Sequence, residues 1–162
     1  MHHYNDLIRI FDDCFFSTYQ TRLICGQDEP LYRPANETCP YHAIIFANQF
    51  FSSALHECAH WCVAGPERRL LVDSGYWYAP DGRTPQQQAL FFDVEVKPQA
   101  LEWLFSQAAG YRFVFSVDNL NDPLFDPRDF KQRVETQVKA YQQNGLPQRA
   151  SIFYHALHRF YD

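Results

Sequence analysis

Residues 56–60, His-Glu-Cys-Ala-His, constrain this chain more than any other feature of its sequence. Two histidines four residues apart lie on one face of a helix, so both imidazoles can reach the same metal ion. An apolar run precedes this region and Gly65-Pro66 follows it, which is typical of a helix end. The pattern predicts a helix over residues 48–64 that carries two metal ligands, with Glu57 positioned to act on metal-bound water.

A catalytic metal usually has three protein ligands and an open position. The longer motif H-E-x-x-H-x-x-G-x-x-H would supply the third ligand nearby, but its glycine and last histidine are replaced by Val63 and Pro66, which excludes that class of protease. The third ligand must then be more distant. The available carboxylates are Asp73, Asp93, Glu95 and Glu102.

Glu95 is the favoured third ligand. Gln88, Phe92 and Glu95 share one face of a predicted helix, and because that face is mostly apolar, the carboxylate would point toward the interior and need a partner. A ligand set of two histidines and one carboxylate suits zinc in a hydrolase. It equally suits non-haem Fe(II) with open positions for O2, so the residues alone leave the metal undecided.

The spacing of apolar residues predicts a single α/β (α+β) domain over residues 1–162, with a small sheet and about five to six helices. The segment 28–40 contains three prolines and is expected to be irregular. Strands are expected at 21–25, 42–46, 111–117 and, one or two of them, within 70–78. Helices are expected at 6–19 with Asn5 as N-cap, at 48–64, at 85–109 with a kink or restart at Pro98, at 127–144 and from 148 onward.

Composition narrows the class of function. The net charge is −5 and there is no basic run, so a nucleic-acid surface is not indicated and DNA is not an expected partner. No apolar stretch approaches the ~20 residues of a membrane span, and the first residues do not resemble a signal peptide. The cysteines lack a C-x-x-C pair and are expected to be reduced thiols of a cytoplasmic protein. These are Cys14, Cys25, Cys39, Cys58 and Cys62.

Other residues that could ligate a metal have simpler explanations. Cys58 and Cys62 lie on a different helix face from the histidines and are expected to be small buried residues. His155 and His158, near the C-terminus, are expected to be ordinary helix residues.

Three segments carry a resemblance to the bacterial elongation factor P hydroxylase family. They are residues 50–62, which contain the histidine motif, residues 73–83 (Asp-Ser-Gly-Tyr-Trp-Tyr-Ala-Pro-Asp-Gly-Arg) and residues 94–105 (Val-Glu-Val-Lys-Pro-Gln-Ala-Leu-Glu-Trp-Leu-Phe). The last two are far more specific than the histidine motif, and the likeness extends over nearly the whole chain.

The resemblance implies a fold similar to a small bacterial metal-dependent ribonuclease and a 2-His-1-carboxylate site on His56, His60 and Glu95. It implies hydroxylation of the β-lysylated lysine of elongation factor P, with Fe(II) as the metal and O2 as co-substrate. The cationic side chain of that substrate would suit Asp73, Glu102 and the aromatic ring of Tyr76. A zinc-dependent peptidase or nuclease and a non-catalytic interaction module are the alternatives.

Overall fold

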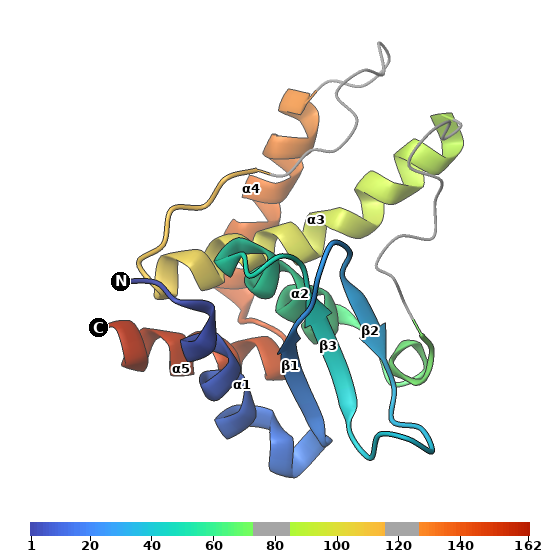
Figure 1. The fold of residues 1–162 in the computed structure, drawn as a ribbon. Helices are drawn as coiled ribbons and strands as arrows, with labels where there is room; N and C mark the ends of the chain where they lie inside the picture. The colour runs from blue at the N-terminus through green and yellow to red at the C-terminus, as the bar shows by residue number, and fades with distance from the viewer. Residues whose placement is uncertain (73–84, 116–126) are drawn as a thin grey trace.

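A small mixed sheet lies at one side of the protein and helices cover it (Figure 1). The computed structural model describes residues 1–72, 85–115 and 127–162. Strand β3 (His42–Phe46) is central, between β1 (Thr21–Cys25) and β2 (Leu31–Arg33). β3 runs parallel to β1, from the pair Thr21–His42 to the pair Cys25–Phe46, and antiparallel to β2.

Helix α1 (Tyr4–Tyr19) packs beside β1 (Figure 1). It buries four apolar side chains at helical spacing: Leu7, Ile10, Phe11 and Phe15. Its N-cap is His3, whose Nδ1 accepts a hydrogen bond from the Asn5 N–H at 3.1 Å, so the prediction that Asn5 is the cap was wrong by two residues.

Helices α2 (Phe51–Val63) and α3 (Pro85–Ala108) form the framework of the site. α2 packs between the sheet and α3, since it contacts β3 as well as α3 (Figure 1). The predicted start at residue 48 was wrong, because Asn48 and Gln49 have φ angles of 57° and 64°, which no α-helical residue adopts. α3 continues through Pro98 as one helix and does not restart there.

Helices α4 (Pro127–Asn144) and α5 (Gln148–Tyr161) pack against α3 and complete the core. A 3-10 turn, Arg68–Leu70, follows α2. The predictions of a single mixed domain with a small sheet and five to six helices agree with these elements. In the described residues no helix is both long enough and apolar enough to cross a membrane.

The predictions for two segments were wrong where the structure describes them: residues 28–40, expected to be irregular, and residues 111–117, expected to form a strand. Residues 31–33 form β2 although the surrounding segment is rich in proline, because β3 offers this short stretch an unpaired edge. Residues 111–115 form no strand. Their aromatic side chains cover α3 instead: the rings of Phe113 and Phe115 each lie 5.4 Å from the ring of Trp103. Leu70 ends the 3-10 turn, and 73–78 lie outside the described residues.

Arg149 connects α5 to the end of α2. Its guanidinium donates hydrogen bonds to the backbone carbonyls of Trp61 and Ala64 and lies 4.6 Å from the centre of the Trp61 ring. A cation at a helix C-terminus satisfies carbonyls that lack intrahelical partners and opposes the negative end of the helix dipole. Arg149 therefore fixes the end of the helix that carries both histidines.

We expect Arg149→Ala to lower the free energy of unfolding by about 2 kcal/mol, because two carbonyls at the end of α2 lose a charged donor. Urea denaturation followed by circular dichroism measures this. Arg9→Ala is the matched control: Arg9 makes an exposed ion pair with Asp6 at 3.2 Å, and its loss should cost less than about 1 kcal/mol. Equal losses in the two variants would contradict a capping role for Arg149.

Candidate metal centre

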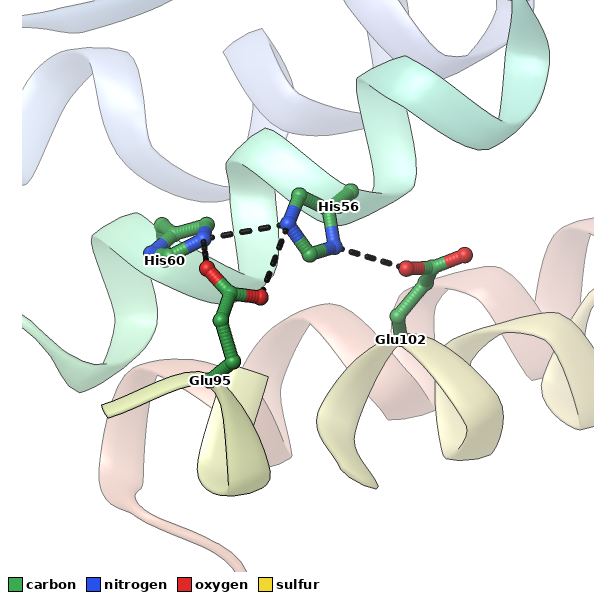
Figure 2. A network of polar contacts seen from close by, with 4 residues as sticks. All are labelled: His56, His60, Glu95 and Glu102. Atoms are coloured by element: carbon green, nitrogen blue, oxygen red, sulfur yellow. Dashed lines mark hydrogen bonds and ion pairs between the residues drawn. The ribbon is translucent and has the colours of Figure 1, made fainter. Parts of the chain in front are cut away.

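His56 and His60 lie one helical turn apart on the face of α2 that is turned toward α3 (Figure 2). Their Nε2 atoms are 3.0 Å apart and their ring centres 4.6 Å apart. The i, i+4 spacing predicted that both imidazoles would point to one place, and the structure puts them there. The other face of this helix is buried, which fixes the direction in which the two imidazoles point.

Glu95 reaches the two histidines from α3. Its Oε1 lies 2.9 Å from His60 Nε2 and its Oε2 lies 3.4 Å from His56 Nε2 (Figure 2). The side chain is only 3% exposed, as expected for the interior face of this helix. Asp93, two residues earlier, is exposed and pairs with Arg133 at 2.7 Å. Asp93, Glu95 and Glu102 are the candidates for the third ligand that the structure describes. Of these, Glu95 is the carboxylate that contacts both histidines.

The three side chains form a coupled electrostatic group. Burial alone would raise the pKa of Glu95, but His60 and His56 hold it well below its usual range. Burial would lower the pKa of His56, yet Glu95 and Glu102 raise it well above its ordinary value. Burial also opposes the charged form of His60, and Glu95 raises its pKa. The arrangement stabilises positive charge at this point, carried either by protons or by a metal ion.

Glu102 holds the opposite side of His56. Its Oε1 accepts a hydrogen bond from Nδ1 at 2.7 Å (Figure 2), and the side chain is 6% exposed. A carboxylate on Nδ1 fixes the imidazole tautomer and leaves Nε2 with a lone pair for a metal. Glu102 was predicted from the resemblance as a substrate residue, and the structure adds this contact to the ligand histidine.

The donor set fits a metal ion. One nitrogen of each histidine and one carboxylate oxygen of Glu95 all lie within 4.8 Å of one another. Two imidazoles and one carboxylate are the ligands of catalytic zinc and of the non-haem iron facial triad. In the described residues no other group of histidine, cysteine or acidic side chains comes together in this way.

The remaining candidate residues behave as predicted where they are described. Cys58 and Cys62 are buried, and burial raises the pKa of the Cys58 thiol well above its ordinary value and that of Cys62 to about 12, so neither is a ready ligand or nucleophile. His155 and His158 are exposed on α5. Asp73 and Tyr76 lie outside the described residues.

Two cavities open beside the candidate metal ligands. The larger, about 590 Å³, contains His56 and Glu102 in its wall, and the smaller, about 320 Å³, contains His60. Glu57 lines both of them. Burial raises the pKa of the Glu57 carboxyl, the two histidines lower it, and Glu95 and Glu102 raise it further. Glu57 is therefore a carboxyl group able to hold a proton next to both openings.

The analysis of the sequence missed the contact of Glu102 with His56. A signal was available, because Glu95 and Glu102 are seven residues apart and so share one face of α3. Two carboxylates on one helix face opposite two histidines on another predict one metal ligand and one carboxylate that supports a ligand.

Substitutions of Glu95 and Glu102 should lower the metal affinity by different amounts. We expect Glu95→Ala to abolish tight binding, because a direct ligand is lost, and Glu102→Gln to weaken it about 10- to 100-fold, because Nδ1 loses a charged acceptor. Asp93→Asn, on the same helix but exposed, is the control and should bind normally. Isothermal titration calorimetry with Zn(II) gives the affinities. A normal affinity for Glu95→Ala would exclude Glu95 as a ligand.

Metal binding should release protons. Because the pKa of His56 and that of His60 lie above their ordinary values, protons occupy these imidazoles in the metal-free protein to a higher pH than in free histidine. Metal affinity should therefore continue to rise with pH above about 6.5, where a free histidine has already lost most of its protons. Titrations in buffers of different ionisation enthalpy measure the released protons, and an affinity independent of pH would refute this.

Comparisons with known proteins agree with the geometry. The family model described as elongation factor P hydroxylase matches residues 10–162. The protein of Haemophilus influenzae named elongation factor P lysine hydroxylase is 56% identical over 160 residues, which cover 99% of this chain and 90% of that protein. The match thus extends over the sheet, the candidate metal centre and the α-helices that the structure describes. The chain belongs to the elongation factor P hydroxylase family.

Proposed function

We propose that this protein hydroxylates a lysine side chain of elongation factor P at a metal held by His56, His60 and Glu95. The observation that carries the proposal is the convergence of these three side chains in a chain 56% identical to a protein named elongation factor P lysine hydroxylase. A zinc-dependent hydrolase has no support in the comparisons, since both matches are hydroxylases.

Fe(II) is the metal we propose for this site, with O2 as co-substrate. Two imidazoles and one carboxylate would hold the ion and leave coordination positions free for O2. Bound Fe(II) would supply the activation of O2 that insertion of oxygen into a C–H bond requires. The role of this chain's own residues is to hold the ion, orient the substrate and control protons around it.

The lysine side chain is proposed to enter through the larger cavity. Its wall contains three carboxylates, those of Asp28, Glu57 and Glu102, against one arginine, Arg112, and this excess of acid favours a cationic guest. Phe50 is 58% exposed at the same cavity and offers an apolar surface to an aliphatic stem. A β-lysylated lysine, longer and more cationic than lysine itself, suits this combination, and Asp73 and Tyr76 are proposed as further contacts.

Glu57 is the proposed catalytic carboxyl group. It follows a metal ligand directly in the sequence and lines the cavity assigned to the substrate. Because burial raises its pKa, it can carry a proton at a higher pH than an exposed glutamate. We assign it the orientation of a water molecule or of the substrate amine, with transfer of a proton at its carboxylate oxygen.

Residues 1–162 are proposed to act as a single catalytic domain in the cytoplasm, where a translation factor is available as substrate. The described helices and strands share one continuous hydrophobic cluster, which supports a single folding unit.

Incubation with Fe(II), a reductant, O2 and β-lysylated elongation factor P should add the mass of one oxygen atom to the substrate, as measured by mass spectrometry. His60→Ala should abolish the gain because a metal ligand is lost. His158→Ala is the matched control, since this histidine is exposed on α5 and should leave the reaction intact.

Unmodified elongation factor P serves as a second substrate and tests whether the β-lysyl group is required. A reaction with Zn(II) under anaerobic conditions that cleaves the substrate would replace the hydroxylase proposal by a hydrolase. Absence of any oxygen gain at full metal occupancy, across the reductants tested, would contradict it as well.

A further inference from the structure

Residues 111–115 have the side-chain alternation of a strand, although they pair with none of the described strands. The odd-numbered residues, all aromatic, are half-buried, and the two residues between them are exposed. The rings of Phe113 and Phe115 lie 5.0 Å apart, and both contact Trp103 on α3. One side of the segment thus faces α3 and the other faces solvent, as in a strand that covers a core with one face.

The backbone of this segment has hydrogen-bonding groups to spare. The Tyr111 N–H donates to the Ser106 carbonyl at 2.8 Å, which closes the end of α3. Within residues 1–72, 85–115 and 127–162, residues 112–115 make no backbone hydrogen bond. Successive N–H groups of an extended chain point to opposite edges, so those of Arg112 and Val114 face away from the Tyr111 bond. A row of such groups is a template on which another chain can pair.

This edge lies at the mouth of the larger cavity, the one assigned to the lysine side chain. All residues of the segment except Phe113 line that cavity, and Val114 is 69% exposed there. Phe50, which precedes α2, lines the same cavity and is 58% exposed. Phe160 on α5 is also exposed, at 46%, but is in the wall of neither cavity. An unpaired backbone edge and exposed apolar side chains therefore meet at one opening.

A strained turn holds Phe50 at this opening. Asn48 and Gln49 have φ angles of 57° and 64°, which residues other than glycine adopt infrequently. The Asn48 N–H donates to the Gln27 carbonyl at 2.7 Å, and the Phe50 N–H donates to the Ala47 carbonyl at 3.1 Å. Strain of this kind persists where surrounding contacts fix the backbone, and it is frequent at ligand-binding sites. The position of Phe50 is therefore built into the fold.

We propose that residues 111–115 pair, as one strand with another, with the segment of elongation factor P that carries the modified lysine. This inference rests on the proposed function. A lysine that reaches the metal centre through the larger cavity brings its own backbone to the mouth of that cavity, where this edge lies. Backbone pairing holds an extended polypeptide, and the acidic wall behind it selects a cationic side chain. Phe50 and Val114 contact the side chains next to that lysine.

The sheet has another edge, at β2, but it lies in a different place. β2 is the last strand in the order β1-β3-β2. Leu31 and Tyr32 line the smaller cavity, and no residue of β2 is in the wall of the larger one. A polypeptide paired with β2 would therefore not bring a lysine side chain to the acidic wall, whereas one paired with 111–115 would.

Hydrogen–deuterium exchange with mass spectrometry measures the pairing directly. The full chain is loaded with Zn(II), which has no redox chemistry, and mixed with β-lysylated elongation factor P without O2. We expect amide exchange in 112–115 to slow about tenfold or more in the complex, because these N–H groups become hydrogen-bonded. Amides of residues 152–160 in α5 are the internal control and should exchange at the same rate with and without elongation factor P.

Two substitutions at one exposed position separate backbone from side chain. Val114→Pro removes an N–H from the edge and should weaken binding of elongation factor P about tenfold, as measured by isothermal titration calorimetry. Val114→Ala keeps the N–H and should have a clearly smaller effect. Thermal melts establish that both variants are folded.

A second pair of variants tests the mouth of the cavity. Phe50→Ser should weaken binding of elongation factor P, because an apolar contact is lost. Phe160→Ser is the matched control, since Phe160 is an exposed phenylalanine outside both cavity walls, and it should bind normally. Equal effects of the two serine substitutions would contradict a role for Phe50 at the interface.

Unchanged exchange at 112–115 in a complex that forms would overturn the proposal, and so would equal weakening by Val114→Pro and Val114→Ala. Absence of a complex at high micromolar concentration would overturn it as well. Exchange that slows with the concentration of this protein alone would show a second copy at the edge, which also excludes the proposal.

These outcomes are separable from those for the proposed function. Hydroxylation of elongation factor P without protection of 112–115 would retain the function and reject the docking edge. Protection of 112–115 that is sensitive to Val114→Pro, without hydroxylation, would retain the docking edge and reject the function.

Discussion

The contact between helices α2 and α3 at Glu95 is the interaction on which the rest of the structure depends. A carboxylate that is 3% exposed cannot keep its charge in an apolar interior without partners, and here its partners are two imidazoles from the neighbouring helix. The register of one helix against the other is therefore set by charge as well as by packing. A slide of one turn would leave both the carboxylate and the histidines without compensation.

The surrounding elements maintain that register. Strand β3 supports α2 from behind, α4 and α5 support α3, and Arg149 holds the last turn of α2 through its carbonyls. Pro98 lies on α3 between the two site carboxylates and removes the hydrogen bond that residue 98 would donate to Val94. The site is built where the backbone of α3 has one hydrogen bond fewer, at a position where the sequence predicted a kink or a restart and the structure shows one continuous helix.

Local patterns were sufficient for the elements whose apolar spacing is regular. The helices predicted at 6–19, at 85–109 and from 148 onward, and the strands predicted at 21–25 and 42–46, agree with the structure to within two residues at their ends. Strand β2 could not be predicted, because its three residues depend on pairing with β3, which is distant in sequence. The alternation in 111–115 has the period of a strand, yet its aromatic face covers Trp103 on a helix, and period alone does not identify the partner.

In the site too, residues placed by local helix geometry could be predicted, and features that depend on packing between helices could not. The position of His56 and His60 followed from helical geometry, and that of Glu95 from an acidic residue on an apolar face. The support of His56 by Glu102 and the separation of two cavities required the packing of two helices.

The histidine motif alone does not distinguish a hydrolase from an oxygenase, because both use ligands of this kind. What separates them is how many reactants must meet at the metal. A hydrolase needs its substrate and a water molecule, for which one opening is sufficient. A hydroxylase must bring together a C–H bond, O2 and a source of electrons. Two cavities, one with His56 and one with His60 in its wall and both lined by Glu57, offer two separate approaches to the same centre, which matches the second requirement better than the first.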